Sequence, residues 1–295
     1  MSTSVTALGA PSRVVPVQVA GRGLRHEARA VRVVWQRDLL RFRTDRSRLV
    51  SSLVQPLLFL FVLGKGLGAS VGTGSGSGSG SYSTFLFPGV LATSVMFTAV
   101  FSAISIVWDR EAGFLREMLV APVSRNSIVL GKCLGGATVA TLQAVVLLAL
   151  AGLVGVPYQP VLLIGAMALL FLVAFTITAF GLVLAVRVQQ IQTVMPRVQL
   201  LLAPLMFLSG AFFPISRALP GWLHLLALLN PLTYGVDAIR RLVFHYLPAQ
   251  GAPGSLTVGL SWAGWAVPVW LDVVIVLGTG GLLLAVACLL FSRTD

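Results

Sequence analysis

Charged side chains are scarce in this sequence, and one stretch between two apolar runs concentrates them. Asp, Glu, Lys and Arg make up only 10% of the chain. Seven of them nevertheless lie between Trp108 and Lys132, namely Asp109, Arg110, Glu111, Arg116, Glu117, Arg125 and Lys132. Such a connection must lie in water between two membrane spans, and it is longer and more charged than a turn requires. We interpret it as a docking surface for another protein.

The other polar residues give little support for catalysis. His26, His224 and His245 are far apart and lack ligand spacing, so we expect no metal site. Cys133 and Cys288 form neither a CxxC pair nor a disulfide framework. A membrane enzyme acting on lipid or glycan would need acids, His or Ser clustered at one membrane surface. Because the sequence offers no such cluster, we do not expect an enzyme.

Buried carboxylates would point to a proton-driven transporter. Asp272 is the only candidate that we identify for a charge inside a predicted span. It lies so near the outer end of that span that we favour an interfacial hydrogen bond over a proton path. No internal repeat is visible either, so proton-driven transport is the weaker hypothesis.

Composition indicates an integral membrane protein. Hydrophobic residues make up 57% of the 295 residues, and the mean hydropathy is +0.93. Uncharged runs approach the ~20 residues with which a helix crosses the bilayer. The net charge of +12 does not indicate nucleic acid, because ten of the 21 basic residues precede Leu49 and most others flank spans. We predict an all-α polytopic protein whose transmembrane domain, 48–291, has spans at about 48–63, 85–107, 128–154, 161–186, 198–213 and 269–291.

Two helices are expected to precede or flank these spans at the membrane surface. Residues 1–23 should be a disordered cytoplasmic tail, and 24–47 an amphipathic interfacial helix. Its apolar stripe would place Trp35 at headgroup depth, with arginines facing anionic lipid; packing on a soluble partner is the alternative. Within the loop at 108–127, a short coupling helix should carry a stripe of Leu115, Met118 and Leu119 and end at Pro122.

The extracytoplasmic segment 214–268 should hold two further helices that do not span. One, between Pro220 and Pro231, is too short, and the next contains Asp237, Arg240 and Arg241. We therefore predict re-entrant or interfacial helices, followed after the last span by a cytoplasmic tail at 292–295.

Orientation follows from the distribution of Lys and Arg. With six spans, the N-terminal region, the two loops at 108–132 and 187–197 and the C-terminus share one side, which carries 10 + 4 + 2 + 1 = 17 basic residues. The other side has four. The positive-inside rule places the first side, with both termini, in the cytoplasm.

Span 1 contains polar residues that could face a pathway. Gln55 either lines a path or bonds across helices, and we favour the bond because interhelical polar contacts are common. The residues that we assign to a pathway on spans 1 and 5 are Ser51, Ser52, Gln55 and Phe207.

Two motifs resemble one family. The run REAGFLREMLVAPVSRNSIVLGK, from Arg110 to Lys132, resembles the cytoplasmic loop of ATP-binding-cassette type-2 transporter permeases, especially drug-resistance exporters with a separate ATPase. The run FFPISRALPGWLHLLALLNPLTYGVDAIR, from Phe212 to Arg240, resembles the segment after the fifth span of that family. With the amphipathic helix and six spans, the resemblance covers about Leu24 to Phe291.

The resemblance implies specific roles for residues in both motifs. The ATPase-coupling residues would be Arg110, Glu111, Gly113, Phe114, Leu115, Arg116, Glu117, Pro122 and Arg125. The outer gate would include Trp222, Asn230, Pro231 and Tyr234. Phe114 and Arg116 depart from the residues found in many relatives, where smaller or acidic side chains stand.

The resemblance also implies partners and a function. Two permease copies, as a homodimer or with a related permease, would bind two nucleotide-binding subunits in the inner membrane among lipids. The chain has no GxxxxGK[ST] phosphate loop, so ATP and Mg²⁺ would be bound by the partner and no cofactor by this chain. The implied activity is multidrug export, with antibiotic resistance, of a drug-like or lipid-like substrate. A polysaccharide or lipid-linked glycan is the alternative, and a transporter without ATP coupling is less favoured.

Overall fold

The computed structural model describes residues 23–44, 46–64, 66, 79–114, 123–215, 219–247, 260–262 and 265–293. Helices dominate these residues, and five of them are long and apolar enough to cross a membrane. The prediction of an all-α polytopic membrane protein is therefore confirmed. The five helices are α4 (Ser79–Glu111, apolar from Tyr82), α6 (Arg125–Leu148), α7 (Pro160–Ala185), α8 (Ile191–Leu208) and α11 (Val269–Ser292).

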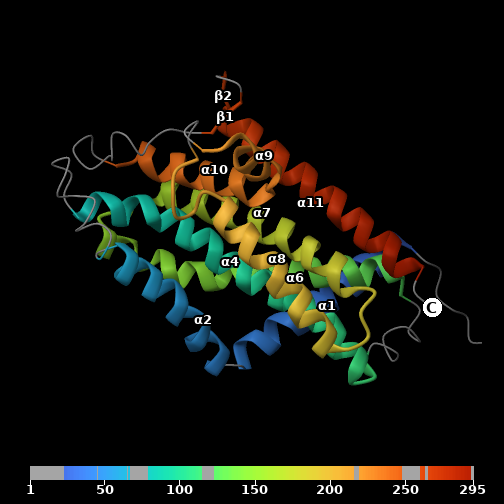
Figure 1. Cartoon of the computed structure of the whole chain (residues 1–295). Coiled ribbons are helices and arrows are strands. Elements are labelled where there is room, and N and C mark those ends of the chain that lie inside the picture. The colour runs from blue at the N-terminus through green and yellow to red at the C-terminus, as the bar shows by residue number, and fades with distance from the viewer. Residues whose placement is uncertain are drawn as a thin grey trace, which may run out of the picture.

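The first predicted span corresponds to two consecutive shorter elements. Helix α2 (Arg46–Leu58) continues directly into the π-helical segment η1 (Phe59–Leu63), and the apolar part begins at Ser52. Pro56 lies inside α2, where its ring prevents one regular backbone hydrogen bond. In Figure 1 these elements lie at the edge of the bundle, beside α4.

The core is centred on α4. From Phe85 to Val107 nearly every side chain of this helix is buried, which suits a helix that is apolar on all sides. Helices α6 and α7 pack along it, and α11 packs on the far side of α7 (Figure 1). Helix α11 therefore leaves much of its own apolar surface exposed, as expected for contact with lipid.

Several predicted boundaries differ from the observed ones. Helix α6 ends at Leu148, and the predicted third span breaks there into the separate 3₁₀ turn η2 (Ala151–Val154) before Gly155 adopts a φ of 79°. Helix α8 begins at Ile191, seven residues before the predicted fifth span, because its polar first turns continue the helix beyond the apolar run. The segment before α11 contains a short antiparallel hairpin that was not predicted. Its two strands, β1 (Ser261–Trp262) and β2 (Trp265–Ala266), have two residues each.

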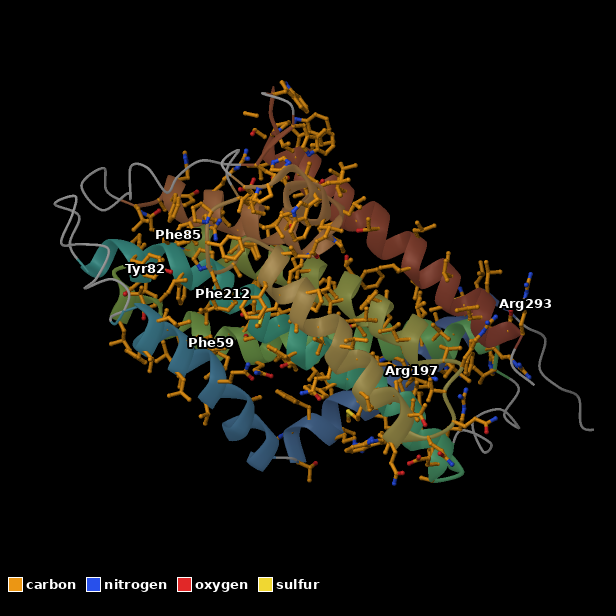
Figure 2. The ribbon with its side chains drawn as sticks, in the orientation of Figure 1. Phe59, Tyr82, Phe85, Arg197, Phe212 and Arg293 are labelled. Atoms are coloured by element: carbon orange, nitrogen blue, oxygen red, sulfur yellow. The ribbon has the colours of Figure 1, made fainter. Side chains whose placement is uncertain are left out.

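The helix ends meet at two opposite ends of the bundle. At one end, which we call the loop end, α4 and α11 end and α6 and α8 begin. The opposite end, which we call the hairpin end, holds β1, β2, α9 (Gly221–Leu229) and α10 (Pro231–His245). Figure 2 shows Arg197 and Arg293 at the loop end, and an aromatic group that includes Tyr82, Phe85 and Phe212 towards the other end.

Helix α1 (Leu24–Thr44) packs along α6 of the same chain. The Nε1 of half-buried Trp35 donates a hydrogen bond of 3.0 Å to Thr138 Oγ1 on α6. Gly131 permits the contact, because a Cβ there would lie 2.8 Å from the Cβ of Val34. The middle of α1 therefore packs on α6, whereas Leu24, the first residue of the apolar stripe, is 91% exposed. The position of this helix at the membrane surface stays a prediction.

Candidate functional site

The first predicted coupling residues fasten two loop-end segments together. Arg110, in the last turn of α4, donates to the carbonyl oxygens of Val186 and Val188 at 2.8 and 2.7 Å. Glu111 Oε1 accepts from the backbone N–H of Ile191 at 2.7 Å, where α8 begins. The exposed N–H groups of a helix start favour such a carboxylate. These two side chains therefore position the connection between α7 and α8 relative to α4.

The next members of the set also have contacts within the chain. Gly113 has a φ of 77°, a conformation that suits glycine, and it turns the chain after α4. The Arg37 guanidinium lies over the Phe114 ring, with its carbon 3.8 Å from the ring centroid. Arg125 donates to the Phe291 carbonyl at 3.3 Å, near the last turn of α11. The coupling residues Leu115, Arg116, Glu117 and Pro122 lie outside the described residues, as do Met118 and Leu119.

A buried ionic cluster lies directly behind this loop. Lys132 Nζ on α6 lies 3.1 Å from Asp38 Oδ1 on α1 and 2.7 Å from Asp109 Oδ2 on α4. It also donates to Ser105 Oγ at 3.0 Å. Arg37 Nη2 contacts the other oxygen of Asp109 at 2.8 Å. We name Asp38, Asp109 and Lys132 the inner cluster; it joins three helices that are distant in sequence.

Burying the three charges of the inner cluster costs free energy unless each charge is paired. Asp38, Asp109 and Lys132 are only 8%, 4% and 1% exposed. Burial raises the pKa of the Asp38 carboxyl above its usual range, and the adjacent Lys132 ammonium opposes this shift. Each carboxylate must therefore stay close to a cation, since a buried charge without a partner costs several kcal/mol.

Helix α1 is also held at its first turns. The hydroxyls of Ser124 and Ser127, at the start of α6, both donate to the Glu27 carboxylate. These bonds lower the pKa of Glu27. Together with Trp35 and Asp38, Glu27 fixes α1 along α6 over most of its length.

Two signals in the sequence could have revealed the inner cluster. Asp38 follows Trp35 by three residues and so falls on the apolar stripe of its helix, where an acid needs a buried partner. Lys132 lies inside the predicted third span at 128–154, although we placed it where the chain re-enters the membrane. The interpretation of Asp272 as the one charge inside a span was wrong for this reason.

Two adjoining cavities lie between α2 and α4. One, of about 270 Å³, is bordered also by α1 and α6, and the other, of about 400 Å³, is bordered also by α8. Gln55, Phe97 and Phe101 line both of them. The remaining lining residues mix apolar side chains with amides and hydroxyls: Phe42, Ser52, Pro56, Ser94, Thr98, Gln143, Met195, Val198, Gln199, Leu202, Ala203 and Met206.

Only some of the residues that we assigned to a pathway line these cavities. Gln55 is exposed and faces both spaces, and Ser52 borders one of them. The interhelical bond that we favoured for Gln55 is made by Gln143, whose amide accepts from Thr98 and donates to the Ser52 carbonyl. Phe207 does not line either space; it is 54% exposed and its ring lies 6.0 Å from that of Phe212. The side chain of Ser51 lies outside the described part of the chain.

Three of the predicted outer-gate residues meet at the turn between α9 and α10. Asn230 Oδ1 accepts from the N–H of Leu232, and its Nδ2 donates to the Leu205 carbonyl at 2.8 Å. Pro231 occupies the first position of α10, where its missing N–H leaves no hydrogen bond unmade. Tyr234 donates to the Leu228 carbonyl at 2.7 Å. Trp222 stands apart on α9 and is 66% exposed.

A second group of charged side chains lies buried or half-buried at the hairpin end. We name Asp237, Arg240, Arg241 and Asp272 the outer cluster. Arg241 pairs with Asp237 at 2.6 Å, one turn away on α10. Arg240 donates to the Gly210 carbonyl at 2.6 Å and lies over the Phe85 ring. Asp272, in the first turn of α11, is fully buried and makes a side-chain contact with Asp237 of α10. The predicted interfacial hydrogen bond of Asp272 stays a prediction.

Comparison with known proteins agrees with this architecture. The ABC-2 type transporter family matches residues 29–244. The chain is 30% identical over 215 residues to the putative transport permease ycf38 of Cyanophora paradoxa, covering 72% of this chain and 73% of that protein. Nodulation protein J of Rhizobium leguminosarum bv. trifolii is 31% identical over 216 residues, covering 72% and 80%.

A bacterial relative has a more specific description. The probable multidrug ABC transporter permease YbhR of Escherichia coli (strain K12) is 26% identical over 166 residues, which cover 55% of this chain and 44% of that protein. Permeases of this family are membrane transport subunits that work with a nucleotide-binding ATPase subunit. The chain belongs to the ABC-2 type transporter family and is a multi-pass membrane transport subunit.

Proposed function

We propose that this chain is the permease of an ATP-binding-cassette exporter that moves a drug-like or lipid-like amphipathic molecule across the cytoplasmic membrane. The observation that carries the proposal is the pair of cavities around Gln55, Phe97 and Phe101. Aromatic rings and Met side chains would bury an apolar body, while the amides of Gln55, Gln143 and Gln199 would bind a few polar groups. A long glycan would need a more polar lining.

The proposal includes a sixth span formed by α2 and η1. Helix α1 is bonded to Ser124 and Ser127 at the loop end, whereas α4 begins at the opposite end. The chain between them must therefore cross the bundle. The segment from Arg46 to Leu63 is helical throughout and roughly 27 Å long at 1.5 Å per residue, close to the thickness of the hydrocarbon core. Helices α9 and α10 would then be the re-entrant pair that forms the outer gate.

The loop end would face the cytoplasm and a separate ATPase that binds ATP and Mg²⁺. The 17 basic residues on that side support this orientation, and the absence of a phosphate loop from the sequence supports a separate motor. Two ATPase copies would bind two permease copies, which we propose to be identical. Arg110, Glu111 and Arg125 would then hold the docking loop in place, leaving Glu117 and Arg116 as partner contacts.

Co-purification with the ATPase encoded next to this chain tests the coupling part of the proposal. We expect the complex to hydrolyse ATP, and Glu117→Ala to weaken the association. Glu111→Gln, which keeps an oxygen for the Ile191 N–H, should retain more coupling than Glu111→Ala. If no ATPase associates, or if Glu111→Ala and Glu117→Ala together leave coupled turnover untouched, the proposal fails.

The substrate class has a separate test in liposomes that contain the complex. Amphipathic cations and lipids should stimulate ATP hydrolysis, and Phe97→Ala or Gln55→Ala should change which compounds do so. Phe207→Ala is the matched control, because that ring lies outside both cavities. Stimulation by glycans alone, with no effect of Phe97→Ala, would contradict the drug-like or lipid-like assignment.

A further inference from the structure

The inner cluster has a property that simple packing does not require. A single ammonium group, on Lys132, serves carboxylates from two other helices, Asp38 at 3.1 Å and Asp109 at 2.7 Å. Well-packed apolar residues would commonly stabilise such an interior as well as ions do, or better. Asp109 lies in the last turns of α4, directly before the charged loop, so the ions stand where the loop joins the bundle.

The geometry allows little independent movement of α1. A shift of α1 by one residue, about 1.5 Å along its axis, would separate Asp38 from Lys132 while both stay buried. Gly135 faces Asp38 so closely that a Cβ there would lie 2.8 Å from its Oδ2. Farther along, Trp35 bonds to Thr138, and Glu27 accepts from Ser124 and Ser127. Packed interfaces of this kind move as units instead of deforming gradually.

Movement of α1 would reach the cavities through α2. Helix α1 ends at Thr44 and α2 begins at Arg46, so one residue separates them. Ser52 and Gln55, in the next two turns of α2, line the cavities. Phe42 of α1 itself lines the smaller cavity. Helix α2 packs mainly on α4 and only slightly on α1 and α6. A displaced α1 would therefore change the cavity directly through Phe42, and through its short connection to α2.

We propose that Lys132, together with Asp38 and Asp109, is the joint that makes α1 move with the loop ends of α4 and α6. Through this joint, movement of the 108–132 loop passes along α1 to α2 and the cavity wall. The inference rests on the proposed function and deepens it, because it identifies positioning residues for ATP-driven opening. Lys132 acts through other groups and touches no substrate.

A charge-balanced double variant separates this role from a structural one. Asp38→Asn with Lys132→Met removes one negative and one positive charge and leaves Asp109 paired with Arg37. Spin labels at exposed Val54 on α2 and Leu200 on α8 report the width of the cavity region. In the complex with its ATPase, Mg-ATP should change this distance for the unaltered permease. We expect the double variant to keep ATPase binding and lose at least two thirds of that change.

The exposed Arg43 of α1 provides the matched control, and Arg43→Met should leave the distance change intact. A purely structural cluster predicts that the double variant, once folded, shows the full change; that result would overturn the inference. A failure of the unaltered chain to bind any ATPase would instead overturn the proposed function, so the two failures are distinguishable.

A cross-link gives a second measurement that does not depend on the folding of the double variant. Trp35→Cys and Thr138→Cys place two thiols on facing positions of α1 and α6, in a chain whose Cys133 and Cys288 are replaced by Ala. A short bis-methanethiosulfonate reagent spans the gap that the missing indole leaves, and thioether-linked spin labels are then attached at positions 54 and 200. If α1 and α6 move as one body, the cross-link leaves the change in the 54–200 distance within about twofold of that seen after the cross-link is reduced. Loss of the change in the cross-linked protein and its return on reduction would overturn the inference.

Discussion

The inner and outer clusters bury similar charges and use them differently. In the inner cluster, Lys132 on α6 contacts carboxylates from α1 and α4. In the outer cluster, Asp237 and Arg241 belong to the same helix, and Arg241 also donates to the carbonyls of Leu260 and Val267. The inner ions therefore join separate helices, whereas the outer ones hold α10 against neighbouring loops.

The contrast indicates which end of the bundle is fixed as one body. Separating the inner helices would leave buried ions without partners, which is strongly unfavourable. At the hairpin end, the ion pair would survive movement of α10 because both members travel together. Asp272 adds a fully buried carboxyl at that end, in contact with Asp237. The loop end is therefore suited to transmit movement as one rigid body, and the hairpin end is suited to the movement that opens the bundle.

The largest effect should come from Lys132→Met. The change keeps the length of the side chain and leaves the carboxylates of Asp38 and Asp109 buried with less positive charge. We expect the free energy of unfolding to fall by about 3–5 kcal/mol, less whatever the carboxyls recover by taking up a proton. Thermal unfolding in detergent measures this loss. Arg43→Met, at an exposed position of α1, should lower the free energy of unfolding by no more than about 0.5 kcal/mol; equal losses in the two variants would remove the distinction.

A smaller loss is expected for Asp237→Asn in the outer cluster. Arg241 is 24% exposed in its side chain and keeps two carbonyl acceptors after the change. Partial contact with solvent weakens the pair, so we expect a loss of about 1–2 kcal/mol. The same unfolding assay applies. A loss as large as that of Lys132→Met would show that the outer pair also joins separate helices.

Asp272→Asn should have the opposite sign. The substitution replaces a fully buried carboxyl by an amide of the same shape, which cannot ionise and therefore avoids the desolvation cost of a carboxylate at this position. We expect stability to be unchanged or to rise by about 1 kcal/mol at neutral pH. Asp38→Asn, at a carboxylate held by Lys132, is the matched comparison and should destabilise. Destabilisation by Asp272→Asn would show that the carboxyl makes a stabilising contact, with Asp237 as the nearest candidate.

The smallest effect concerns pH and the first turns of α1. The Ser124 and Ser127 hydroxyls lower the pKa of Glu27, so its contribution is fully present above its ordinary pKa of about 4.3. It is lost as pH falls through the lowered value. Amide exchange over residues 24–30, corrected for intrinsic rates, should therefore quicken in acid. Glu27→Gln should exchange equally fast above and below this range, and any pH step that persists in it has another origin.

Much of this architecture could be predicted from local pattern. The five long helices follow from apolar length, and the turn at Asn230 and Pro231 follows from capping chemistry. The packing of α1 on α6 could not be predicted in this way, because an amphipathic period does not say which surface it covers. The inner cluster needed a pairing of Asp38 with Lys132, which are 94 positions apart.

The roles of individual residues in the candidate site could not be predicted from local pattern either. Gln55 borders the cavities while Gln143 makes the interhelical bond, and both are glutamines in apolar helices. Their roles differ because of how far each helix is rotated toward its neighbours, which composition does not encode. Arg110 and Glu111 were both assigned to ATPase coupling, which stays a prediction. Their bonds to the 186–191 segment could not be predicted, because they depend on where α7 ends.

The central claim is that α1 moves with α6 while the cavity wall changes. Pulsed electron resonance on the permease–ATPase complex, diluted with unlabelled chain, tests it with two label pairs. Labels at exposed Gln36 and Asn126 span α1 and α6, and labels at Val54 and Leu200 span α2 and α8. On addition of Mg-ATP, we expect the first distance to stay constant and the second to change. A first distance that changes as much as the second, or a second that does not change at all, would contradict the claim.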